Sequence, residues 1–161
     1  MSAGESATVT VVVAVAPEEA FEVFTAEVDR WWRRGPRYRV AGGRDGALRF
    51  EPGAGGRLVE EGELSAGRKT FELARVTAWE PPSRLLLAWR NVNFAPGEST
   101  EVEVTFTAVE GGTRVVVTHR GWGAIRRGHP ARHGLEGAPF SRMIGMWWAD
   151  VLTALRESTA R

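Results

Sequence analysis

The sequence predicts an α+β protein in which a curved antiparallel β-sheet wraps around one long C-terminal helix. Three observations lead to this fold class. Apolar residues alternate with a period of two through the middle of the chain, turn residues separate these short segments, and the last apolar segment has the helical period. Since 161 residues is about the length of one domain, we expect a single domain over residues 1–161, with its core at about 8–156.

The first two elements are expected to be a strand at Thr8–Val15 and a helix at Pro17–Trp32. The strand segment is β-branched and lacks both Gly and Pro. Pro17 suits the first helical position, and the two glutamates after it suit the positive end of a helix dipole. Apolar residues then recur at helical spacing, and we expect one break near Thr25–Ala26.

A period of two takes over after this helix. The segment Glu101–Val109 alternates apolar and polar residues, which is typical of an antiparallel strand with one wet face. The Gly-rich stretches GGRDG and PGAGG each join two short strands and therefore predict hairpin turns. The predicted strands are Tyr38–Val40, Ala47–Glu51, Arg57–Glu63, Phe71–Trp79, Arg84–Asn91, Glu101–Val109 and Thr113–Arg120.

The last element is predicted to be a long amphipathic helix at Phe140–Arg156. Its apolar stripe needs a concave sheet to cover it, because the stripe is wider than a single row of side chains. The residues of this stripe are Phe140, Met143, Ile144, Trp147, Trp148, Val151, Leu152 and Leu155.

Composition narrows the function. The chain has 21 basic and 20 acidic residues, and a net charge of +1 argues against a nucleic-acid partner. Without cysteine there is no thiol nucleophile or thiolate metal site, which agrees with the cytoplasmic location that we expect. The sequence lacks the long apolar run of a membrane span. It also lacks dinucleotide, phosphate-loop and serine-nucleophile motifs, so we expect no cofactor.

The order of these elements and several motifs resemble the START-like (SRPBCC, Bet v-type helix-grip) superfamily. Within it, the chain is similar to bacterial homologues of the C-terminal domain of the heat-shock ATPase activator. The motifs that carry the resemblance are Gly55-Gly56-Arg57-Leu58, the segment Val76–Leu85, Trp89, the segment Thr113–Trp122, and the closing Trp148, Leu152 and Leu155. The resemblance covers Thr8 to about Leu155 and implies a sheet that grips the last helix, with a short broken helix after the first strand.

One segment departs from the usual bacterial pattern. The stretch Arg126–Pro139 is longer and more basic than this family leads us to expect before its closing helix. Two arginine-rich stretches, at residues 30–44 and 114–132, lack acidic partners. They are interpreted either as solvated loops or as flanks of a pocket mouth that attract an anionic head group.

The seven tryptophans are more than packing requires, and they favour a cavity between the sheet and the last helix. Aromatic walls suit a planar or hydrocarbon ligand. The alternative is an ordinary core, which we expect for Trp79 and Trp148. The predicted ligand-binding residues are Trp32, Trp89, Phe106, His119, Trp122, Met143 and Trp147.

His119 is the main titratable candidate. Strand alternation places it on the same inward face as Val115 and Val117. There it is either a core histidine held by a polar partner, or a general base beside Glu61 or Asn91. His129 and His133 have helical spacing, but Pro130 separates them and no third ligand is evident, so we expect no metal site.

Three functions stay open. A binding or carrier protein for a small hydrophobic or aromatic molecule fits the tryptophans best, and it requires no chemistry. An enzyme of the cyclase or hydrolase kind would use His119 with an inward Glu or Asn. Chaperone ATPase activation is implied by the resemblance alone, because this fold also hosts lipid carriers, cyclases and hormone receptors. A homodimer is a further expectation.

Overall fold

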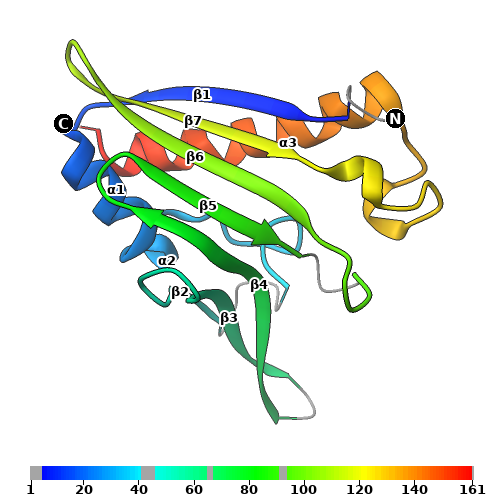
Figure 1. Ribbon diagram of the computed structural model, residues 1–161. Coiled ribbons are helices and arrows are strands. Elements are labelled where there is room, and N and C mark those ends of the chain that lie inside the picture. The colour runs from blue at the N-terminus through cyan, green and yellow to red at the C-terminus, as the bar shows by residue number, and fades with distance from the viewer. Residues whose placement is uncertain (1–4, 41–45, 65–66, 91–93, 161) are drawn as a thin grey trace.

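A curled antiparallel sheet holds a long C-terminal helix in its curve (Figure 1). The computed structural model describes residues 5–40, 46–64, 67–90 and 94–160, with the backbone alone at residues 63 and 64. Within these ranges the seven strands have the order β1-β7-β6-β5-β4-β3-β2. They are β1 (Ala7–Val13), β2 (Ala47–Phe50), β3 (Arg57–Leu64), β4 (Gly67–Glu80), β5 (Arg84–Trp89), β6 (Thr100–Val109) and β7 (Gly112–Arg120). The helix-grip architecture predicted from the sequence is confirmed.

The β6–β7 hairpin lies between β1 and β5 in the sheet and shows which side chains form its inner face. Val102 pairs with His119, and Val104 pairs with Val117, so these four side chains point into the core. The tight turn needs a glycine at position 112, because a Cβ there would lie 1.9 Å from the Val13 carbonyl oxygen of the neighbouring β1.

The helical segment after β1 is broken, as the sequence predicts, into α1 (Pro17–Thr25) and α2 (Val28–Trp31). At the break, the Thr25 hydroxyl donates a hydrogen bond of 2.8 Å to the Phe21 carbonyl. The indole of Trp31 donates to the Val23 carbonyl at 3.0 Å and ties α2 back to α1. The aromatic side chains of α1 pack on Phe106 of β6.

The last helix, α3 (Gly137–Ser158), packs against β1 and α2. It begins three residues earlier than the predicted Phe140, because a proline such as Pro139 is tolerated in a first helical turn. The Gly137 N–H, one of the unpaired donors of that turn, donates to the Glu5 carboxylate at 2.9 Å. The N-terminal residues thereby hold the start of α3.

The stretch Arg126–Pro139 folds over the end of the sheet instead of extending into solvent as a basic loop. It includes the short 3-10 helix η2 (Pro130–Arg132). Another 3-10 helix, η1 (Trp122–Ala124), precedes the stretch. Its apolar residues form a second, smaller core with Phe94, Trp122 and Phe140. The guanidinium of Arg132, which is 1% exposed, is the polar centre of this unit.

The predicted strand at Tyr38–Val40 is wrong. The N–H groups of Tyr38 and Arg39 both donate to the Gly35 carbonyl, at 3.0 and 2.9 Å, so this segment is a turn. The N–H of Val40 donates to the Glu60 carboxylate at 2.8 Å, instead of to a neighbouring strand. The backbone groups of this segment are therefore satisfied without a sheet partner.

The expectation that the arginine-rich stretches lack acidic partners is also wrong for several of their arginines, although Arg37 has no ion pair with a described carboxylate. Arg39 pairs with Asp29 at 2.6 Å, and Arg132 pairs with Glu5 at 2.7 Å. Arg120 pairs with Glu101, which lies directly across the strand ladder, and with Glu103, two residues further along β6. These partners lie between 10 and 127 positions away along the chain, so inspection of neighbouring residues does not reveal them.

Candidate functional site

A pocket of about 780 Å³ opens between the inner face of the sheet, α3 and the segment of residues 36–40. Its volume lies in the range of small-molecule sites, roughly 300–1,000 Å³. Each wall comes from a different part of the chain: Leu73 and Trp89 from the sheet, Met143 and Ile144 from α3, and Ala131 from η2. Five of its lining residues are tryptophans: Trp32, Trp89, Trp122, Trp147 and Trp148.

Four of these indoles form one contact network. The rings of Trp32 and Trp89 are stacked, with centroids 6.2 Å apart and an interplanar angle of 23°. Trp147 and Trp148 meet edge to face at 5.1 Å, and each also packs edge-on against Trp32, at 5.8 and 5.9 Å. These arrangements match the stacked and edge-to-face geometries that aromatic pairs prefer.

Two of the indole N–H groups fix the turn that borders the pocket. Trp32 donates to the Tyr38 carbonyl at 3.1 Å, and Trp147 donates to the Arg37 carbonyl at 2.8 Å. The Tyr38 hydroxyl and Arg33 both donate to Asp150 of α3, at 3.2 and 2.6 Å. The turn that the sequence analysis took for a strand is thus bound to α3 by side chains.

Trp122 differs from the other indoles of the pocket. Its Nε1 is buried and, among the described residues, has no hydrogen-bond partner. Leaving such a donor unpaired typically costs about 1–3 kcal/mol. The pocket wall therefore contains one unsatisfied N–H group.

His119 lines the pocket and is 3% exposed. The Trp148 indole donates to its Nδ1 at 3.1 Å, so the ring proton lies on Nε2, which donates to the Thr100 hydroxyl at 2.7 Å. The Thr100 hydroxyl in turn donates to the Trp89 carbonyl. Burial lowers the pKa of His119 from 6.5 to about 3, so the ring is neutral.

Of the seven predicted ligand-binding residues, six line this pocket: Trp32, Trp89, His119, Trp122, Met143 and Trp147. The seventh, Phe106, points to the same side of the sheet but packs on Phe21 and Phe24, with ring centroids 5.2 and 5.7 Å apart. Alternation predicts which face of the sheet a side chain is on. It does not predict which residues on that face are covered by α1 and are therefore outside the pocket.

Glu61, one of the two predicted partners of His119, does not bond to it; the hydrogen bonds of His119 go to Thr100 and Trp148. Glu61 is partly exposed and accepts a hydrogen bond from Arg49 at 3.4 Å. Its neighbour Glu60 is the inward carboxylate of β3, 0% exposed, and it accepts from Val40. Asn91 lies outside the described residues.

Several lining residues were not predicted. Tyr38, Leu73, Arg90 and Ile144 join the pocket, and so does Trp148, which the sequence analysis assigned to packing. For Ile144 and Trp148 the signal was present in the apolar stripe of α3, since both neighbour predicted residues on it. Nothing in the sequence marks Arg90, because its place depends on how far β5 extends.

The buried guanidinium of Arg39, in the pocket lining, pairs with the partly exposed carboxylate of Asp29. Burial alone would raise the pKa of Asp29, but hydrogen bonds from the Leu48 N–H and from Arg39 hold it below its usual range. Arg39 is neutralised by this carboxylate and also donates to backbone carbonyls at Trp32 and Arg33. Among the described residues, no three acidic or histidine side chains gather in a way that could hold a metal ion.

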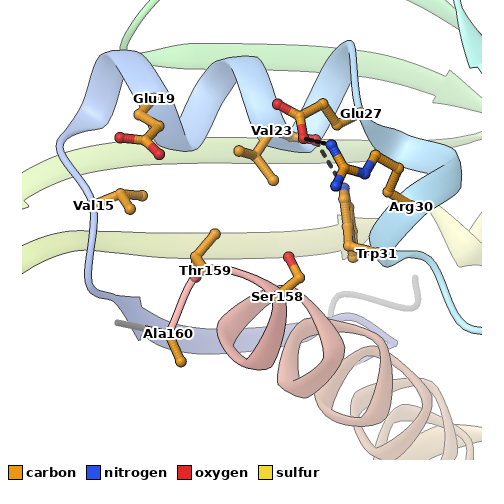
Figure 2. A pocket seen from close by; sticks show the side chains of 9 residues that line it. All are labelled: Val15, Glu19, Val23, Glu27, Arg30, Trp31, Ser158, Thr159 and Ala160. Carbon is orange, nitrogen blue, oxygen red and sulfur yellow. Dashed lines mark hydrogen bonds and ion pairs between the residues drawn. The ribbon is translucent and has the colours of Figure 1, made fainter.

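A second, smaller pocket of about 370 Å³ lies between α1 and the C-terminal end of α3. Figure 2 shows Val23 of α1 facing Ser158 and Thr159 across it, with Glu27 and Arg30 paired at one side. Its lining is more polar than that of the tryptophan pocket and includes one aromatic ring, that of Trp31, among the described residues.

Comparison with known proteins places this geometry in a family. Residues 14–147 match the family described as "Activator of Hsp90 ATPase homolog 1-like protein". No curated protein matches the sequence. No helix in the described ranges is long and apolar enough to cross a membrane.

Solved structures with the same fold cover nearly the whole chain. A protein of unknown function from Staphylococcus aureus is 14% identical, with a TM-score of 0.65 and coverage of 94% of this chain and 91% of that one. A protein from Mesorhizobium loti is 18% identical, with a TM-score of 0.62 and coverage of 94% of both chains. The Aha1 dimer from Colwellia psychrerythraea is 18% identical, with a TM-score of 0.61 and coverage of 96% and 95%.

Proposed function

The chain belongs to the activator of Hsp90 ATPase homolog 1-like family of the START-like superfamily, and from this we propose that it binds or carries a small apolar or aromatic molecule. The ligand occupies the tryptophan pocket between the sheet and α3. The observation that carries the proposal is the pocket itself, with five indoles around a volume of about 780 Å³. Sites of this kind combine an apolar wall with a few polar groups that set orientation.

The enzyme alternative receives less support from the site. A general base must have a free ring nitrogen, but both nitrogens of His119 are hydrogen-bonded to Trp148 and Thr100. Its pKa of about 3 also makes it a weak base. In our proposal His119 is therefore a core residue that accepts a hydrogen bond from Trp148 and takes no part in chemistry.

The family description and the dimeric relative suggest a second candidate, an interaction with a chaperone ATPase. This candidate predicts a protein partner and gives the tryptophan pocket no role. A homodimer, a cytoplasmic location and a one-domain organisation stay predictions.

The test is a titration with the neutral aromatic dye N-phenyl-1-naphthylamine. We expect saturable dye emission and quenching of tryptophan emission, with a Kd in the micromolar range, on the order of −8 kcal/mol. Met143→Trp should fill the pocket and weaken binding by about tenfold or more, because Met143 is part of the lining.

Met146→Trp is the matched control. Met146 lies on the same helix, is 65% exposed and does not line the pocket, so this variant should bind like the natural protein. Equal affinity of both variants, or no saturable binding across a panel of neutral dyes and fatty acids, would contradict the proposed function.

A further inference from the structure

The described charged residues in the lining of the tryptophan pocket, apart from its histidines, are all positive. Its described residues include three arginines, Arg37, Arg39 and Arg90, and no Asp or Glu. Arg39 has its counter-charge in Asp29, at 2.6 Å. Arg37 and Arg90 have no ion pair with a described carboxylate, so their two positive charges are uncompensated by ion pairing.

Arg90 is held in place without being neutralised. Its Nε donates to the Glu98 carbonyl at 3.3 Å, and its Nη2 donates to the carbonyls of Phe94 and Ala95, each at 3.1 Å. Backbone carbonyls orient a guanidinium but carry no net charge. Because the side chain is already ordered, binding an anion to it would lose little further conformational entropy.

Arg37 lies on the turn that Trp147 holds. The Trp147 indole donates to the Arg37 carbonyl at 2.8 Å, and the guanidinium sits over the Tyr38 ring, 5.5 Å from its centroid. Arg90 directly follows Trp89, another indole of the pocket. Each of these two arginines is therefore close to an indole of the pocket through the backbone. The Arg37 carbonyl binds the Trp147 indole, and Arg90 is the residue after Trp89.

These contacts favour a ligand that has both an aromatic ring and an anionic group. Indole faces favour a planar aromatic ring, and a guanidinium favours a carboxylate or sulfonate, with which it forms charge-assisted and often paired hydrogen bonds. Beside an apolar wall the attraction is stronger than in open water. We propose that the pocket selects aromatic acids, with the ring among the indoles and the anionic group bound by Arg37 and Arg90.

This inference rests on the proposed function and adds a charge to its ligand. The test uses two dyes that share one ring system: N-phenyl-1-naphthylamine, which is neutral, and 8-anilinonaphthalene-1-sulfonate, which carries a sulfonate. We expect the sulfonate to bind at least about tenfold more tightly than the neutral dye, and this gain should shrink as salt is added.

Arg37→Gln and Arg90→Gln should each weaken binding of the sulfonate by about tenfold more than they weaken binding of the neutral dye. Arg37→Gln keeps the backbone carbonyl that Trp147 binds. Arg90→Lys keeps the charge and should retain most of the sulfonate affinity that Arg90→Gln loses. This result would show that the charge of Arg90, and not its hydrogen bonds to residues 94–98, determines the affinity. Arg114→Gln, an exposed arginine of β7 outside the pocket, is the control for net charge.

The outcomes distinguish the two proposals. If neither dye binds, or if Met143→Trp leaves both affinities unchanged, the ligand pocket itself is refuted, and the charge preference with it. If the neutral dye binds in the pocket but the sulfonate gains nothing, or if Arg37→Gln and Arg90→Gln behave like Arg114→Gln, only the preference for acids is overturned.

Discussion

His119 shows how one buried side chain joins four elements. It receives a hydrogen bond from Trp148 of α3, lies on β7, donates to Thr100 of β6 and reaches the β5 backbone through that hydroxyl. In this series of hydrogen bonds, from Trp148 through His119 and Thr100 to the Trp89 carbonyl, each side-chain donor has an acceptor. A neutral ring is required, because an added proton on Nδ1 would oppose the Trp148 N–H.

The first prediction at the residue scale concerns acid. The unfolded chain takes up a proton at His119 near pH 6.5, whereas the folded chain does so only near about 3, so this histidine lowers stability as pH falls below 6.5 and has no such effect above it. In His119→Gln this loss is absent. The stability gap between the natural protein and the variant should shrink by about 2–3 kcal/mol between about pH 7 and about pH 4.5.

Urea unfolding at both pH values measures this gap. His133→Asn is the control, because it removes an exposed histidine at a left-handed backbone position that asparagine tolerates. A gap that stays constant with pH in His119→Gln would show that the ring is not buried in its neutral form. Since both ring nitrogens bind protein groups, we expect the affinity of this variant for the neutral dye to be nearly unchanged.

At the scale of elements, the pair of Glu5 and Arg132 joins the start of the described chain to η2, the short helix that precedes α3. The two side chains form a bidentate contact at 2.7 and 3.0 Å, and Arg132 also donates to carbonyls at Trp122 and Ile125. The guanidinium lies over the Phe140 ring, 4.9 Å from its centroid. This geometry leaves Arg132 dependent on one carboxylate for its counter-charge.

Glu5→Ala should therefore reduce the free energy of unfolding by about 3–5 kcal/mol, because it strands a buried positive charge. Glu27→Ala, which breaks the exposed pair with Arg30, should change it by about 0–1 kcal/mol. Adding Arg132→Met to Glu5→Ala should recover part of the loss. Equal effects of Glu5→Ala and Glu27→Ala in thermal or urea unfolding would contradict the buried pair.

The elements that the sequence predicts correctly are those with enough periods to average over. The alternation of β6 and β7 and the apolar stripe of α3 each span several repeats, and the break between α1 and α2 lies where it was expected. Tyr38–Val40 failed because three residues carry no period. Its backbone is decided by Gly35 and by Glu60, which is 20 residues away.

At the scale of the whole molecule, the sequence located the site through its aromatic residues, and it left open whether the arginine-rich stretches flank that site or are solvated loops. Tryptophans are rare and the faces of several follow from periodicity, so four of the five lining tryptophans could be named from spacing and the resemblance: Trp32, Trp89, Trp122 and Trp147. Which arginines are neutralised depends on pairs such as Arg39 with Asp29 and Arg132 with Glu5, which form only when distant segments meet. That Arg37 and Arg90 have no ion pair with a described carboxylate could be seen only after the structure showed which other arginines do.

The network of Trp32, Trp89, Trp147 and Trp148 has an optical consequence. With ring centroids 5.1 to 6.2 Å apart, an excited indole passes its energy to a neighbour long before it emits. The four rings therefore act as one antenna, and a quencher seated on a single ring extinguishes the emission of all four. The depolarisation of tryptophan emission in time-resolved measurements should be far faster than molecular tumbling. Trp32→Phe should slow it by removing one of the two rings that touch all the others of the four. An anisotropy that decays only with tumbling would mean that these indoles are optically isolated.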